Sequence, residues 1–155
     1  MIENLFLIIA AIIIIIFIWL FWLRNSLMRD LIAVTQIQSI LKSDFAKRRD
    51  IIPYLLESYK AASEPTDLWR KLLDLRSRTD SSEIEILETL QGFFASSQSI
   101  KNINFHEAKK NISDLNKHIE ASNIEIKAKS EIYSALRKRF PYSLASAIFS
   151  LPELS

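Results

Sequence analysis

The sequence contains no cysteine, and it has only one glycine and four prolines in 155 residues. Without cysteine the chain cannot form a disulfide, a cysteine-based zinc site, a thiol nucleophile or a thiol-linked lipid anchor. The scarcity of glycine and proline leaves few positions for hairpin turns or glycine-rich phosphate-binding loops. Together these absences predict an all-α chain.

Charge is absent from Leu5 to Leu23, a run of nineteen residues made of Ile, Leu, Phe, Ala and Trp. As a helix rising about 1.5 Å per residue it spans roughly 28 Å, close to the hydrocarbon thickness of a bilayer. A cleaved signal peptide fits poorly, because residues 1–4 carry no Lys or Arg and no small-residue cleavage site follows. The run therefore predicts an uncleaved transmembrane helix, with Trp19, Trp22 and Arg24 at one membrane interface.

Basic residues gather after this run. From Arg24 to Arg49 there are six basic residues and two acidic ones, whereas residues 1–4 carry one acid, Glu3. Since Lys and Arg are retained on the cytoplasmic side, residues 1–4 are expected outside and the large remainder in the cytoplasm.

A helical pattern continues beyond the apolar run to about residue 62. Pro53 lacks the N–H that bonds the carbonyl four residues earlier, so a kink is expected there. Ser63, just before Pro65, predicts the cap of a short second helix, and Ser82 with Glu85 predicts a capping box for a third. Alternating steps of three and four form a stripe at Leu31, Val34, Leu41, Phe45, Ile52, Leu55 and Tyr59, with Gln38 and Arg48 as its polar members.

The longest soluble pattern lies between residues 105 and 140. This last helix is the natural partner of the first, and a coiled-coil-like pairing inside an antiparallel four-helix bundle over residues 24–141 is the economical arrangement. Its stripe comprises Phe105, Ala108, Ile112, Leu115, Ile119, Ser122, Ile126, Lys129, Tyr133, Leu136 and Phe140.

In the tail, residues 142–155, the ten residues from Tyr142 to Leu151 carry no charge and predict a short apolar helix. Serines line one side of this helix, and Leu144, Ile148 and Phe149 lie elsewhere around it. An antiparallel return brings the tail back to the membrane surface, where two placements are open. It either lies in the headgroup boundary, or packs on the bundle or on the emerging first helix near Leu27 and Met28.

Two segments carry a family resemblance. The first reads Lys47-Arg48-Arg49-Asp50-Ile51-Ile52-Pro53, and the second has Tyr133, then Phe140-Pro141 and an apolar tail. Together with the N-terminal membrane helix, this order of parts resembles the LemA family, of which the chain looks like a divergent member. The resemblance implies a membrane-anchored antiparallel four-helix bundle with a cytoplasmic body and no established enzymatic activity. The matching signature positions are Arg48, Asp50, Ile52, Pro53, Tyr133, Phe140 and Pro141.

Motifs for catalysis and for metal or nucleic-acid binding are incomplete. His106-Glu107 begins like a zinc-protease helix, but Lys110 stands where the second histidine is required. The basic cluster 47–49 is flanked by Asp44 and Asp50, which weakens it as a phosphate-binding face, and Arg48 is expected to pair inside the bundle. We therefore predict no enzymatic activity, cofactor, metal, nucleic-acid partner or small-molecule substrate.

The sequence thus predicts a structural or adaptor protein, anchored once in a bacterial plasma membrane or a membrane derived from it. Its expected partners are the bilayer and, through the bundle, another protein or a second copy of the chain. A signalling protein is the alternative, in which the continuous helix from Leu5 to Tyr59 transmits a displacement across the bilayer. The predicted organisation is an outer segment (1–4), a transmembrane helix (5–23), a cytoplasmic bundle (24–141) and a membrane-proximal tail (142–155).

Overall fold

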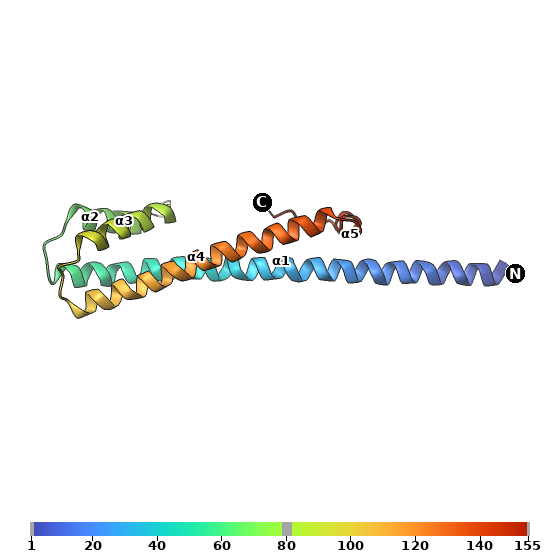
Figure 1. Cartoon of the computed structure of the whole chain (residues 1–155), viewed down its shortest axis with the longest axis horizontal. Helices are drawn as coiled ribbons and strands as arrows, with labels where there is room; N and C mark the ends of the chain where they lie inside the picture. Colours follow the sequence, from blue (N-terminus) through green and yellow to red (C-terminus); the bar gives the residue numbers. More distant parts are fainter. Residues whose placement is uncertain (1, 79–81, 155) are drawn as a thin grey trace. The chain divides into compact units, whose positions relative to one another are not determined.

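In the computed structural model, residues 2–78 and 82–154 are described, and every regular element among them is an α-helix. Met1, in the predicted outer segment, and residues 79–81, after the second helix, lie outside the described residues. The all-α class predicted by the composition is confirmed. The helices are α1 (Ile2–Lys60), α2 (Asp67–Ser77), α3 (Glu83–Ser96), α4 (Ile103–Lys138) and α5 (Tyr142–Ile148), coloured along the chain in Figure 1.

Helix α1 runs without a break from the apolar N-terminal segment to Lys60. It continues through Pro53, where the neighbouring residues Ile52 and Leu55 are buried and hold the turn in place despite the missing backbone hydrogen bond. Between Phe6 and Trp19 every side chain except that of Ala10 is exposed. By length and composition, α1 is a helix that can cross a membrane with its apolar N-terminal part.

The chain divides into two compact units. Unit 1 comprises residues 1–38 and 124–155, and unit 2 comprises residues 39–123. Helices α1 and α4 contribute residues to both units, because each is long enough to pass from one to the other. The predicted boundaries after residues 4, 23 and 141 stay predictions.

Unit 2 is built on a core to which α1, α2, α3 and α4 all contribute side chains. At one end of this core the rings of Tyr59, Phe93 and Phe105 pack together, with centroids 4.8–6.1 Å apart. Helices α2 and α3 lie side by side (Figure 1). The predicted stripes on the two long helices are buried in this unit at Ile52, Leu55, Tyr59, Phe105, Ala108, Ile112 and Ile119.

The starts of α2 and α3 are set by hydroxyl caps. The hydroxyl of Ser82 accepts a hydrogen bond from the backbone N–H of Ile84, which confirms Ser82 as the cap of α3, while the part of Glu85 in the predicted capping box stays a prediction. The predicted cap of α2 at Ser63 is wrong, because Thr66 performs this role by accepting from the backbone N–H of Trp69. Thr66 stands nearer to the first apolar residues of α2, so the helix starts later than the proline suggests.

The last long helix ends before the end of its predicted stripe. Helix α4 stops at Lys138, and a cis peptide bond joins Phe140 to Pro141 before α5 starts at Tyr142. Phe140 is 78% exposed instead of continuing the buried stripe. The physical reason is that the residue before a proline disfavours the helical conformation, so the helix cannot carry Phe140 onto the same face. The predicted short C-terminal helix is present as α5.

Candidate functional site

The most buried charge in unit 2 belongs to Arg48 of α1, whose side chain is 1% exposed. Its Nη1 donates a hydrogen bond of 2.9 Å to the side-chain oxygen of Asn116 on α4. Its Nη2 donates to the carboxylate of Glu83 on α3 and, at 3.1 Å, to the carbonyl of the same residue. One guanidinium therefore connects α1, α3 and α4.

The carboxylate of Glu83 also pairs with a second arginine, Arg49. Arg49 Nε donates to the other carboxylate oxygen at 2.8 Å, so two neighbouring guanidiniums share one acid. Glu83 is also the first residue of α3, where a negative charge is favoured by the helix dipole. A buried charge is tolerated when it is paired and hydrogen-bonded, and this arrangement meets that need at both Nη atoms of Arg48, whereas its buried Nε has no hydrogen-bond partner. The cluster can fix the start of α3 against α1.

A second polar pair lies one helical turn away. Asp44 of α1 is 3% exposed, and its Oδ2 lies 2.7 Å from Nδ1 of His118 on α4. Its Oδ1 accepts a 3.1 Å hydrogen bond from Lys47. Burial alone raises the pKa of Asp44, but the hydrogen bonds and positive charges of His118 and Lys47 outweigh it and lower the pKa below 3.8.

The sequence patterns did not predict this pair. The ring of His118 is mostly exposed, but its Nδ1 meets an acid 74 positions away in the chain. A signal was present, since Asp44 lies three residues after Leu41 and four before Arg48, on the same side of α1 as the stripe. Asp44 and His118 open onto a surface hollow that is also lined by Lys47, Asn111, Asp114 and Leu115.

Unit 1 presents a different kind of site, where α5 packs against α1. Leu20 and Leu23 of α1 form a buried cluster with Ala145 of α5, and Tyr142 and Phe149 pack around it. Both leucines belong to the uncharged run for which the sequence predicts a transmembrane helix. Helix α5 therefore contacts the last turn of that run.

Arg24 stands at the edge of the same cluster. Its guanidinium lies 5.8 Å from the ring centre of Phe21 and 5.5 Å from that of Phe149. A guanidinium at this distance is attracted to the face of an aromatic ring. The first basic residue after the uncharged run is thus held between α1 and the end of α5.

The chain after α5 folds back onto α1 and α4. Leu151 forms a buried cluster with Leu27 and Tyr133, against which Met28 and Leu154 also pack. Of the two placements left open for the tail, the structure has the packing on the emerging first helix near Leu27 and Met28. This packing leaves Leu144 and Ile148 of α5 exposed.

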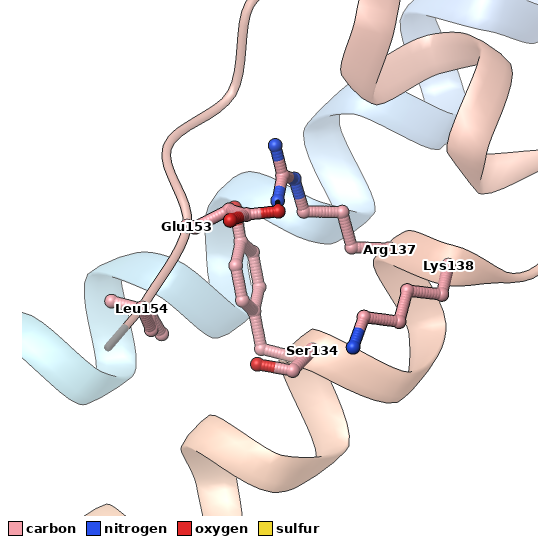
Figure 2. Close-up of a pocket in the computed structure, with 6 residues that line it drawn as sticks. Ser134, Arg137, Lys138, Glu153 and Leu154 are labelled. Carbon is pink, nitrogen blue, oxygen red and sulfur yellow. Dashed lines mark hydrogen bonds and ion pairs between the residues drawn. The ribbon is translucent and has the colours of Figure 1, made fainter.

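Polar contacts hold the C-terminal segment in place. The hydroxyl of Tyr133 donates to the carbonyl of Pro152 at 2.8 Å. Arg137 forms an ion pair with Glu153 (Figure 2). Ser134, Lys138 and Leu154 complete the lining of a small pocket beside this ion pair. Burial raises the pKa of Tyr133, although the charge of Arg137 opposes the shift.

The predicted site residues have different environments. In unit 2, Arg48 and Ile52 are buried, Pro53 is half-buried and Asp50 is exposed. In unit 1, Tyr133 is buried, whereas Arg24, Pro141 and Phe149 are half-buried and the side chains of Trp19, Trp22, Phe140, Leu144 and Ile148 are exposed. The structure brings Arg24 and Phe149 together, and the roles of Glu83, Asn116 and Pro152 are additions that no sequence pattern indicated.

Within residues 6–78 and 82–154, no group of three or more His, Asp or Glu side chains is arranged to hold a metal ion. In comparisons with protein-family models, curated proteins and solved structures, none matches this chain.

Proposed function

We propose that this chain is a LemA-type structural or adaptor protein, anchored once in a bacterial plasma membrane or a membrane derived from it. Residues 5–23 cross the bilayer, residues 1–4 lie outside, and residues 24–141 form a cytoplasmic four-helix bundle that binds another protein or a second copy. The observation that carries this proposal is the difference in environment between the two ends of α1. Its first part is apolar and exposed, and its last part is buried in a core shared with α2, α3 and α4.

The exposed apolar part favours a lipid environment over water. A continuous exposed surface of Ile, Leu, Phe and Trp at this length is unusual on a soluble monomer and is typical of a segment that faces lipid. Because the helix is unbroken, insertion of its first part tethers everything that packs on its last part. Tethering a rigid helical body to a surface is what an adaptor requires.

Contacts along the two long helices favour the antiparallel arrangement that the proposal contains. Asp44 of α1 meets His118 of α4, Arg48 meets Asn116, and the carbonyl of Ser58 accepts from Asn102. The residue number thus rises along α1 while it falls along α4. In a bundle of this kind the ends of α1 and α4 that are closest to the apolar run lie on the membrane side.

Orientation is tested with single cysteines in the full-length protein, which has none of its own. Glu3→Cys is expected to react with an impermeant thiol reagent in intact cells, and Ser82→Cys only after the membrane is opened. Labelling of the cysteine at position 82 in intact cells contradicts the proposed orientation. Recovery of the protein in the soluble fraction contradicts the anchor itself.

The adaptor role is tested by crosslinking the full-length protein in its membrane. We expect a fixed partner or an ordered homo-oligomer, and the absence of both counts against an adaptor.

The continuity of α1 favours a signalling role as the second candidate. The double substitution Thr35→Gly and Gln36→Gly, at two exposed positions of α1, weakens the helix and separates the adaptor role from the signalling role. An adaptor that only tethers should keep its crosslinking pattern in this variant. A protein that transmits a displacement along α1 should show a changed pattern.

A further inference from the structure

We propose that α5 is a second membrane contact, whose outer face enters the headgroup boundary of an anionic phospholipid leaflet. This inference rests on the proposed anchoring by residues 5–23. The feature that carries it is a juxtaposition within unit 1: the inner face of α5 is fixed to the last turn of the uncharged run, while its outer face is apolar and uncovered.

The depth of α5 follows from its contacts. Ala145 packs with Leu20 and Leu23, which are four residues or fewer from Arg24, the first charge after the run. When the run spans the bilayer, these leucines lie at the boundary between acyl chains and headgroups. A helix about 10 Å in diameter that packs on them cannot lie outside that boundary.

The outer face has the chemistry of an interfacial helix. Leu144 is 44% exposed and Ile148 is 54% exposed, and they stand four residues apart on one side of α5. Phe140 precedes them, and Phe21 and Trp22 are exposed on the adjoining turn of α1. Aromatic and aliphatic side chains at this level prefer the headgroup boundary to water.

The polar neighbours favour an anionic leaflet. Lys138 and Arg139 are exposed directly before Phe140, and no acidic residue occurs between Arg137 and Pro152. Glu153, the first acid after this segment, is already paired with Arg137. Exposed basic residues beside a partly inserted apolar face add an electrostatic attraction to anionic headgroups. A short apolar face binds weakly alone, but the anchor supplies it at high effective concentration.

The test uses the full-length protein in vesicles of phosphatidylcholine and phosphatidylglycerol. Single cysteines replace Leu144 or Ile148 and carry an environment-sensitive fluorophore, whose quenching is measured with acyl-chain-labelled phospholipid and with aqueous iodide. Ile13→Cys in the anchor is the lipid-exposed control, and Ile84→Cys, at an exposed apolar position of unit 2, is the aqueous control.

We expect the fluorophores at positions 144 and 148 to be quenched by the lipid and protected from iodide, as at position 13. Quenching by iodide alone, as at position 84, overturns the proposal while the anchor stands. Protection from both quenchers also overturns it, because a protein surface then covers the face. If position 13 itself escapes lipid quenching, the anchoring, and so the proposed function, is wrong.

Charge is tested separately. Lys138→Gln with Arg139→Gln is expected to abolish the increase in lipid quenching at position 148 that follows replacement of phosphatidylcholine by phosphatidylglycerol. Lys101→Gln with Lys127→Gln removes the same charge from exposed positions elsewhere and is expected to leave that increase intact. An increase that survives the first pair of substitutions contradicts the preference for an anionic leaflet.

Discussion

Asp44 is a buried acid whose ionisation is linked to the stability of the fold. Its pKa is lowered in the folded protein, so the ionised carboxylate stabilises the fold above its ordinary value of 3.8, and this contribution is lost as the pH falls through the folded value. In unfolded chains the same group titrates near 4. The contribution is therefore complete at neutral pH and disappears only in acid.

We expect Asp44→Asn to lower the free energy of unfolding at neutral pH by about 1.5–3 kcal/mol, because hydrogen bonds to a charged group are lost. Below about pH 4 the difference between variant and wild type should begin to shrink, because Asp44 becomes protonated in the unfolded chain first. The difference is lost once the pH falls below the lowered pKa of the folded protein, where Asp44 is protonated in both states. Denaturant titrations of the detergent-solubilised protein across this range measure the effect. Asp114→Asn, at an exposed acid of α4, is the control, and an equal pH dependence for both variants contradicts the assignment.

Gly92, the single glycine, lies inside α3 without a conformational need for glycine. A β-carbon added there comes within 3.7 Å of Leu68 Cδ1, an ordinary van der Waals contact. Gly92→Ala is therefore expected to raise the free energy of unfolding by about 0.5–1 kcal/mol, since alanine loses less backbone entropy in a helix. Thermal melts followed by circular dichroism measure this change. A lower melting temperature contradicts this expectation and means that the added β-carbon at position 92 clashes with Leu68 of α2.

At the scale of elements, the ion pairs of Arg48 and Arg49 with Glu83 hold the start of α3 against α1. Glu83→Gln keeps the shape of the side chain and removes the charge that compensates a buried guanidinium, so we expect a loss of about 3–5 kcal/mol. Glu88→Gln changes the same residue type at an exposed position of the same helix and should alter stability by less than about 0.5 kcal/mol. Equal effects in denaturant titrations contradict a structural role for the ion pair.

The same scale explains which element boundaries were predictable. Ser82 caps α3 as its sequence context indicates, because a hydroxyl just before an apolar-periodic segment is a local signal. At α2 two candidate hydroxyls precede the helix, and Thr66 prevails over Ser63. Local patterns identify such candidates, but packing of Leu72 and Leu75 into the core selects the turn at which the helix starts.

At the scale of the whole molecule, the proposed anchoring predicts that membrane retention depends on the apolar run of α1. Replacing Ile12 and Ile16 together by arginine should cost about 6–8 kcal/mol on the insertion scale, because each exchange loses an apolar side chain and adds a charge near the bilayer centre. We expect this variant to leave the carbonate-resistant membrane pellet. The control with leucine at both positions should stay there, and retention of the arginine variant contradicts a spanning anchor.

The sequence by itself determined the all-helical class, the apolar run, the two long stripes and the Ser82 cap. Each of these depends on neighbouring residues: hydropathy over about twenty positions, steps of three and four, or a hydroxyl at a helix start. The burial of Ile52, Leu55, Phe105 and Ile112 follows from such spacing alone.

Only the tertiary structure decided which polar groups meet. Arg48 pairs with Glu83 across 35 positions, Asp44 with His118 across 74, and Tyr133 with the carbonyl of Pro152 across 19. It also decided that α5 lies on Leu20 and Leu23. Periodicity indicates which face of a helix is buried. It carries no information on which other helix covers that face, or on the register of the two helices along their axes. That choice depends on how side chains from distant segments fill a shared core and satisfy each other's charges.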